Sequence, residues 1–198
     1  MRFHYRLGWV AALGLARLLW RFRVRGAERI PLDGPVVIAS NHISNWDPVL
    51  VGLGCPREVS FLAKEELFRN PLLAWLIRAY NAIPVRREAS DTQALRLAIS
   101  VLRDDGAILM FPEGTRSRDG TIGRAKEGVA FLATKAGANV VPAFITGSNA
   151  LGSAFAGRRR LGVAYGEPIR GDADGSVAGL TERIMESIAA LRAEDEMR

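Results

Sequence analysis

Short apolar runs with strand character alternate with helical segments along most of this chain. The expected strands are Val36–Ser40, Val59–Ala63, Ala82–Arg86, Ala107–Phe111, Val140–Ile145 and Leu161–Tyr165. The expected helices are Pro48–Leu53, Pro71–Ala79, Asp91–Arg103, Glu127–Ala136 and Ser176–Ala193. Strands separated by helices are typical of a sheet with helices on both faces. The sequence therefore predicts an α/β fold with a mostly parallel, mixed sheet flanked by helices.

The size and cysteine content narrow the class of protein further. With 198 residues, of which 48% are hydrophobic, the chain has enough material for one ordinary core and hence a single domain. Its one cysteine, Cys55, excludes an intrachain disulfide and favours a location that faces the cytosol. We expect Cys55 to be a small buried hydrophobe.

The positive charge is concentrated at the N-terminus. Residues 1–25 contain six arginines and no acidic residue, which equals the formal net charge of +6 for the whole chain. These arginines flank the apolar stretch Leu7–Trp20, which contains two tryptophans. A nucleic-acid-binding protein usually spreads its basic residues over a folded face with stacking aromatic residues. The sequence thus gives no support for a nucleic-acid partner.

The apolar stretch is too short to span a bilayer. As a helix it would reach roughly 21 Å, against about 30 Å for the hydrocarbon core. No small-residue cleavage site follows it, which disfavours a signal peptide. We expect residues 1–25 to form a basic amphipathic helix at the membrane interface, ahead of a domain over residues 26–198. The protein would then be peripheral or monotopic on the cytoplasmic face; packing of the helix on its own domain is the alternative.

A first polar loop follows the buried strand Val36–Ser40. His42 comes directly after that strand, and Asp47 follows five residues later, before Pro48. An imidazole can take a proton from a hydroxyl, and a carboxylate on its other nitrogen fixes the tautomer. The same residues also fit a structural role, because Asp47 followed by proline is a good helix cap. The residues alone leave both interpretations open.

No enzyme nucleophile accompanies His42 in the sequence. The chain has no G-x-S-x-G motif, and Cys55 has no neighbouring base. If His42 is a general base, the substrate must therefore supply the nucleophilic oxygen. The two histidines provide too few ligands for a zinc site, so no metal is expected.

A second polar loop follows the strand Ala107–Phe111. Gly114, Thr115 and Arg116 offer backbone N–H groups, a hydroxyl and a guanidinium, and Glu113 precedes them. A guanidinium binds phosphate oxygens in a bidentate manner. A polar surface turn is the alternative. Loops at the carboxyl ends of neighbouring strands are where such sheets place their sites.

These motifs together resemble those of a known family. The pattern from Asn41 and His42 to Asp47 resembles the N-H-x4-D motif of the bacterial 1-acylglycerol-3-phosphate acyltransferases, a glycerolipid acyltransferase family. The sequence FPEGTRS at 111–117 is similar to the family's third block, and Val140–Pro142 resembles the fourth. Ile83–Arg87 resembles the second, although Asn81 stands where that block usually begins with glycine.

The resemblance implies an activity and a role for each matching residue. His42 would deprotonate the hydroxyl of a lysophospholipid, with Asp47 orienting it, and the oxygen would attack an acyl thioester. Arg87, Glu113, Gly114 and Arg116, together with Thr115 and Lys64, would bind the acceptor, and Pro142 would shape the acyl pocket. The donor would be acyl carrier protein or coenzyme A thioester, and no cofactor is implied. The implied product is phosphatidic acid, for phospholipid biosynthesis in a membrane.

Three alternatives remain beside this interpretation. The same reaction on another lyso-lipid, such as lyso-ornithine lipid, would use the same residues. A lipid hydrolase would need a nucleophile or a metal-bound water, for which the sequence offers no candidate. A non-catalytic membrane-binding module would tolerate the replacement of His42, whereas the acyltransferase would not.

Overall fold

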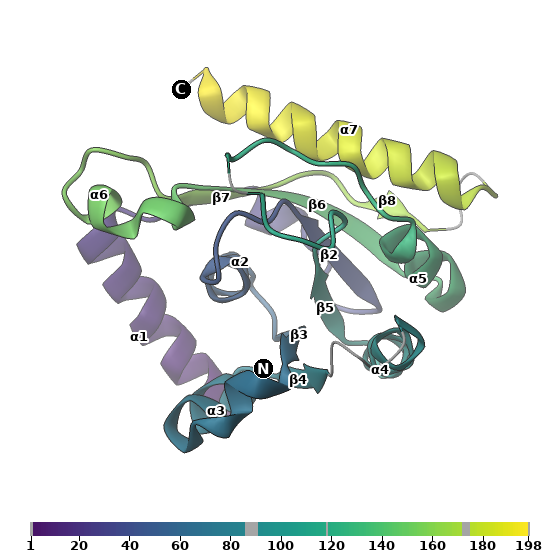
Figure 1. Ribbon diagram of the computed structural model, residues 1–198, viewed down its shortest axis with the longest axis horizontal. Coiled ribbons are helices and arrows are strands. Elements are labelled where there is room, and N and C mark those ends of the chain that lie inside the picture. The colour runs from purple at the N-terminus through teal and green to yellow at the C-terminus, as the bar shows by residue number, and fades with distance from the viewer. Residues whose placement is uncertain (1, 86–90, 118, 172–174, 198) are drawn as a thin grey trace.

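The computed structural model describes residues 2–85, 91–117, 119–171 and 175–197. Its centre is one mixed sheet with the strand order β1-β7-β6-β2-β5-β3-β4, and β8 pairs with β6 (Figure 1). The strands are β1 Arg23–Arg25, β2 Val36–Ser40, β3 Val59–Lys64, β4 Ala82–Val85, β5 Ala107–Met110, β6 Asn139–Thr146, β7 Gly162–Tyr165 and β8 Ile169–Arg170. All pairings are parallel except those of β6 with β7 and β8. The predicted α/β fold with a mostly parallel, mixed sheet is confirmed.

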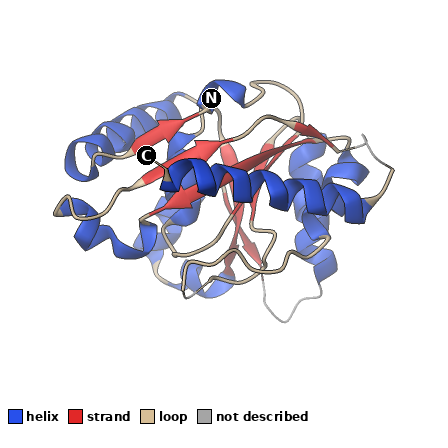
Figure 2. Ribbon diagram, turned by 90° about the horizontal axis from the view of Figure 1, so that it is seen from above, coloured by secondary structure: helices blue, strands red, loops and turns tan. Residues whose placement is uncertain are grey.

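Helices cover both faces of this sheet. They are α1 Phe3–Trp20, α2 Asp47–Gly54, α3 Pro71–Ala79, α4 Asp91–Arg103, α5 Gly128–Ala136, α6 Leu151–Phe155 and α7 Val177–Glu196, with 3₁₀ turns η1 Ala27–Arg29, η2 Glu65–Arg69 and η3 Ser148–Ala150. One face packs against α1, α2 and α6, and the other against α4, α5 and α7. Figure 2 shows α7 lying across its face of the sheet.

The alternation of side chains along β2 divides the core into two layers. Val36 and Ile38 point into the layer beneath α1 and α2, whereas Val37 and Ala39 point into the layer beneath α5 and α7. All four side chains are fully buried. Because both faces of the strand are covered, its sequence is continuously apolar and does not alternate between apolar and polar residues. β2 therefore holds the centre of the sheet, and the loop that follows it starts from a rigid position.

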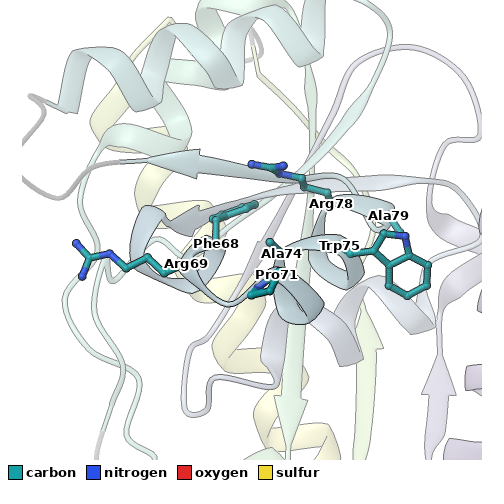
Figure 3. Close-up of a pocket in the computed structure, with 7 residues that line it drawn as sticks. All are labelled: Phe68, Arg69, Pro71, Ala74, Trp75, Arg78 and Ala79. Carbon is teal, nitrogen blue, oxygen red and sulfur yellow. The ribbon is translucent and has the colours of Figure 1, made fainter.

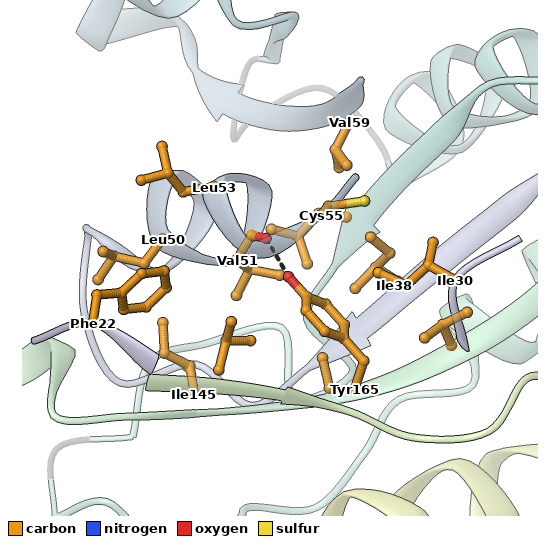
Figure 4. Packing of buried hydrophobic residues seen from close by; sticks show 14 of the residues in the cluster. Phe22, Ile30, Ile38, Leu50, Val51, Leu53, Cys55, Val59, Ile145 and Tyr165 are labelled. Carbon is orange, nitrogen blue, oxygen red and sulfur yellow. Dashed lines mark hydrogen bonds between the residues drawn. The ribbon is translucent and has the colours of Figure 1, made fainter. Parts of the chain in front are cut away.

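Cys55 and Tyr165 lie inside the first of these layers (Figure 4). Cys55 is fully buried, as expected. The Tyr165 hydroxyl donates to the Val51 carbonyl of α2. Burial raises the pKa of Tyr165 well above its ordinary value, so the hydroxyl stays protonated as a donor. This bond fixes α2, and with it the loop before α2, against β7.

The basic N-terminal segment forms a helix that is shorter than residues 1–25. α1 ends at Trp20, and Arg23–Arg25 then form the edge strand β1, which pairs with β7. Tyr5, Leu13 and Ala16 are buried, so one side of α1 shares the core of the domain. Across the described residues, no helix combines the length and the apolar character needed to cross a bilayer.

The turn between α3 and β4 explains the asparagine in the second block. Asn81 has φ 61°, a left-handed conformation that asparagine adopts more readily than most non-glycine residues. Its side-chain amide donates to the Glu58 carboxylate at 3.1 Å. The position needs a positive φ, which glycine adopts freely and which Asn81 also adopts here.

Candidate active site

His42 and Asp47 form a hydrogen-bonded pair at the carboxyl end of β2. The imidazole Nδ1 lies 2.8 Å from Asp47 Oδ2, and the Asp47 side chain is fully buried while that of His42 is 17% exposed. With the carboxylate on Nδ1, the proton of the neutral imidazole belongs on Nδ1, and Nε2 keeps its lone pair. The pair can thus accept a proton at Nε2 of the partly exposed His42 side chain.

Asp47 is held by the loop rather than used as a helix cap. Its Oδ2 also accepts the backbone N–H groups of Ile43 and Ser44 at 2.7 Å and 2.8 Å. Asp47 is the first residue of α2, and the residue before it, Trp46, makes no side-chain cap hydrogen bond. The carboxylate therefore turns back on the loop that carries His42, and the helix-cap interpretation is wrong.

The second oxygen of Asp47 has a partner far away in the sequence. The Ser148 hydroxyl, which is buried in the turn after β6, donates to Asp47 Oδ1 at 2.5 Å. Gly147 before it has φ 77°, and a Cβ there would lie 1.9 Å from the Arg160 carbonyl oxygen. Only glycine fits this turn without displacing backbone. The turn after β6 thus brings the Ser148 hydroxyl to the His42–Asp47 pair.

The second loop is fastened to the first around His42. Glu113 is buried, and its carboxylate accepts the His42 N–H at 3.2 Å and the Gly123 N–H at 3.0 Å. The Ser117 N–H donates to the His42 carbonyl at 2.8 Å. The Phe111 ring stacks on the imidazole, with centroids 3.9 Å apart and planes 13° apart. The imidazole is thus fixed by a carboxylate at its edge and a phenyl ring on its face.

Comparison with known proteins assigns the family. Residues 21–146, which include both loops, match the family model described as Acyltransferase. The chain belongs to the acyltransferase family. The resemblance seen in the sequence is confirmed, and the protein is classed with acyltransferase enzymes.

Curated members of the acyltransferase family and one solved structure agree with this assignment. The 1-acyl-sn-glycerol-3-phosphate acyltransferase of Streptococcus pneumoniae is 31% identical over 77% of this chain and 58% of its own. The Bacillus subtilis protein of the same name is 30% identical over 74% of this chain and 73% of its own. The crystal structure of the 1-acyl-sn-glycerophosphate acyltransferase of Thermotoga maritima is 28% identical, with a TM-score of 0.76, and covers 100% of this chain and 85% of that one. The chain spans just over half the length of the pneumococcal relative and 37% of a chloroplast relative from Arabidopsis thaliana.

The residues expected to bind the acceptor fall into three groups. Gly114, Thr115 and Arg116 are exposed on the loop that is fastened to His42. Lys64 is exposed at the end of β3, on the sheet edge where the parallel neighbours β2 and β5 also end. Arg87 lies outside the described residues.

Glu113 and Pro142 occupy positions that constrain their expected roles. Both carboxylate oxygens of Glu113 accept backbone N–H groups, so the side chain joins the two loops of the site. Pro142 is buried within β6 in register with Ala39, on the face that α7 covers. Their roles toward acceptor and acyl chain stay predictions.

Three further residues at the site were not identified from the sequence. Phe111 was assigned to the end of a strand, and Ser148 lies 101 positions from Asp47. Lys126 lies over Gly114: a Cβ on that glycine, which has φ 69°, would lie 3.2 to 3.3 Å from the lysine side chain. The absence of a side chain at Gly114 therefore leaves room for the Lys126 side chain against this loop. A lysine twelve residues after Gly114 gives no local signal of this contact.

The bond from Ser148 leads to a testable expectation. We expect Ser148→Ala to lower kcat a few-fold, because the carboxylate that orients His42 loses its donor on Oδ1. The free energy of unfolding should fall by about 1 kcal/mol, typical of one internal hydrogen bond. Ser148→Thr keeps the hydroxyl and should retain most of the kcat and of the free energy of unfolding. Ser153→Ala on α6 is the matched control. Steady-state kinetics and thermal unfolding measure the two effects; a wild-type kcat in Ser148→Ala would contradict the role.

Proposed function

We propose that this protein transfers a fatty acyl group from an acyl thioester to the free hydroxyl of 1-acylglycerol-3-phosphate, which gives phosphatidic acid. The observation that carries the proposal is the 2.8 Å bond between His42 and a fully buried Asp47 beside the FPEGTRS loop. The names of the relatives from Streptococcus pneumoniae and Bacillus subtilis support the choice of acceptor.

The nucleophile is the hydroxyl of the acceptor itself. Burial raises the pKa of the Cys55 thiol to about 11, so it stays protonated at neutral pH and is no thiolate nucleophile. Among the described residues the His42 ring bonds to a carboxylate and to no serine or threonine hydroxyl. This favours direct transfer and disfavours a covalent acyl-enzyme.

The proposed reaction is balanced by one proton that passes through His42. Nε2 takes the proton of the acceptor hydroxyl while the oxygen attacks the thioester carbonyl carbon. The carbon–sulfur bond then breaks, and the imidazolium returns the proton to the leaving thiolate. Asp47 stabilises the imidazolium between the two transfers, as a buried carboxylate does in hydrolytic triads.

The phosphate of the acceptor would lie against the FPEGTRS loop. Arg116 offers a bidentate guanidinium, Thr115 a hydroxyl, and Lys126 a second positive charge beside Gly114. Lys64 would extend this positive edge, and Arg87 is proposed to bind the acceptor on the resemblance alone. Glu113 would act by holding the loop, since its oxygens are engaged. Coenzyme A or acyl carrier protein would deliver the acyl group, and the mechanism uses no metal.

Arg116→Gln tests the assignment of the phosphate. Loss of a charge-assisted bond of roughly 1.5–3 kcal/mol should lower kcat/KM for 1-acylglycerol-3-phosphate by about tenfold to a hundredfold, mostly through KM. The effect should be smaller for a lyso-lipid with an uncharged head. Arg158→Gln, which changes an exposed arginine in the loop after α6, is the matched control. Equal losses for charged and uncharged acceptors would contradict the assignment.

The outer side of α1 would lie in the membrane interface. Phe3 and Leu18 are 83% and 78% exposed, and Leu7 and Val10 between them are also exposed on the same side of the helix. Arg6 and Arg17 border this stripe and are exposed as well. An exposed apolar stripe bordered by arginines suits the boundary between headgroups and acyl chains of an anionic bilayer. The buried side of α1 fixes the helix to the domain. We place the protein on the cytoplasmic face.

The proposed function is tested with a labelled acyl thioester and a panel of acceptors. We expect the purified protein to acylate 1-acylglycerol-3-phosphate faster than lyso-ornithine lipid or a lysophospholipid with a larger head group. Thin-layer chromatography separates the products. Equal or faster acylation of another lyso-lipid would overturn the choice of acceptor. Release of fatty acid from a phospholipid without any thioester would instead indicate a lipid hydrolase.

A further inference from the structure

The segment between β3 and β4 exposes large apolar side chains that the core does not use. It consists of η2 and α3, residues 65–79, which we call the elbow. Leu67, Leu72 and Trp75 are 44%, 75% and 69% exposed. Surface residues of this size, gathered on two short consecutive elements, are typical of an interaction surface.

A groove with positive charge crosses the elbow. It has a volume of about 600 Å³ and is lined by aromatic and aliphatic side chains together with Arg69 and Arg78. Figure 3 shows Arg69 and Trp75 at opposite ends of this groove, with Arg78 over Phe68 between them. The Arg78 guanidinium lies 5.4 Å from the centre of the Phe68 ring. Glu65 and Glu66 line an adjoining pocket that shares Phe68, Arg69 and Arg78 with this groove. Among the residues that the structure describes, neither arginine forms a salt bridge with a carboxylate.

The elbow adjoins the first turns of α1. The rings of Tyr5 on α1 and Tyr80, the residue after α3, lie 5.4 Å apart. Arg2 bonds to Glu58 and Asn81, which ties the start of α1 to the end of the elbow. In Figure 1, α1 and α3 meet at one corner of the molecule, away from α7. The elbow and the start of α1 therefore lie side by side, and each carries exposed apolar side chains.

The elbow also lies at the edge of the sheet that carries His42. η2 begins directly after Lys64, the last residue of β3, so it leaves the sheet at the carboxyl ends of the parallel strands. A single helix in the interface fixes depth but leaves the domain free to rotate about the helix axis. A second contact off that axis fixes the rotation, and a contact at this edge turns the site toward the bilayer.

We propose that the elbow is a second membrane contact that binds anionic phospholipid. Leu72 and Trp75 enter the boundary between headgroups and acyl chains, where tryptophan is favoured. Arg69 and Arg78 bind lipid phosphates, whose negative charge complements the two guanidinium groups. The proposal deepens the proposed function, because it rests on an acceptor that resides in the bilayer.

Flotation of the full chain with vesicles tests the elbow. The vesicles are phosphatidylcholine alone or with added phosphatidylglycerol. We expect Arg69→Gln/Arg78→Gln to weaken partition into the anionic vesicles by roughly tenfold or more, and to flatten its dependence on phosphatidylglycerol. Leu72→Ser/Trp75→Ser should weaken partition into both kinds of vesicle. Leu7→Ser/Leu18→Ser on α1 tests the first contact in the same way.

Matched controls separate surface position from residue type. Leu32→Ser replaces an exposed leucine (64%) before β2, near the amino ends of the parallel strands, and Arg103→Gln replaces an exposed arginine at the end of α4. Neither should change partition. Thermal unfolding verifies that every variant is folded, and acylation of a short-chain acceptor in dilute solution should be unchanged in the elbow variants.

The outcomes distinguish this proposal from the proposed function. Wild-type partition in both folded elbow variants overturns the membrane contact. Wild-type partition with slower transfer from a protein-borne thioester also overturns it, and would assign the elbow to the carrier protein. If the wild type acylates no acceptor, the proposed function fails, whereas the flotation result still decides the role of the elbow.

Discussion

Replacing His42 by alanine is expected to lower kcat/KM for acyl transfer by roughly 10²- to 10⁴-fold, the usual contribution of a general base. In the proposed mechanism the imidazole Nε2 is the proton acceptor, and the bond from Nδ1 to Asp47 fixes the tautomer that leaves Nε2 free to accept. Its removal leaves the acceptor hydroxyl to lose its proton to water. The initial rate of phosphatidic acid formation, measured at saturating thioester, gives the effect.

The control for this variant is Asn45→Ala, which changes an exposed residue in the same loop. It should keep the wild-type rate, and thermal unfolding should show that both proteins are folded. A His42→Ala protein that retains full transfer would contradict the proposed general-base mechanism.

Replacing Asp47 by asparagine should be similarly severe for the rate, roughly 10³- to 10⁴-fold, while preserving the shape of the side chain. An asparagine that keeps its oxygen toward the N–H groups of Ile43 and Ser44 can still accept from Nδ1. It loses the charge that stabilises the imidazolium. The flipped amide would instead donate to Nδ1 and place the proton on Nε2, the wrong tautomer for a base.

Asp47→Ala separates the catalytic from the structural part of this effect. Without the carboxylate, the buried donors that it satisfies lose their acceptor, at a cost of about 1–3 kcal/mol for each buried group left unpaired. We therefore expect a clear loss of unfolding free energy in Asp47→Ala and a smaller one in Asp47→Asn, with both nearly inactive. Chemical denaturation measures the free energy of unfolding, and initial rates measure the remaining activity. An Asp47→Asn enzyme with near wild-type kcat would mean that the charge is not needed.

The sheet was predictable because its central strands are buried on both faces. Val36–Ser40 and the neighbouring runs are continuously apolar, and the helices between them keep their own periodicity. The edge strands β1 and β8 were missed, because two or three residues show no period. The direction of β7 could not be inferred either, since an apolar run is the same for parallel and antiparallel pairing.

The site was predictable only where its residues are close in the sequence. His42 and Asp47 are five positions apart, and their spacing pointed to the pair that the structure contains. Ser148 and Phe111 reach that pair through the packing of other strands, so no local pattern marks them. Residue type also left one contact unseen: Glu113 was expected to bind the acceptor, and its buried carboxylate accepts two backbone N–H groups as well.

The N-terminal helix illustrates the same limit. Its arginines and tryptophans predicted an interfacial helix, and packing on the domain was the alternative. α1 has features of both, because Leu13 and Ala16 are buried while Leu7 and Leu18 remain exposed. A helix that joins the core on one side cannot be recognised from its own composition, since the residues that cover it lie elsewhere in the chain.

Direct attack of the lipid hydroxyl on the thioester is tested best by following both products in one reaction. Thiol release and labelled phosphatidic acid are measured with labelled acyl thioester, with and without 1-acylglycerol-3-phosphate. The proposed mechanism predicts one phosphatidic acid for each thiol, and negligible thiol release when the acceptor is omitted. Thiol release without acceptor, accompanied by labelled protein or free fatty acid, would contradict it.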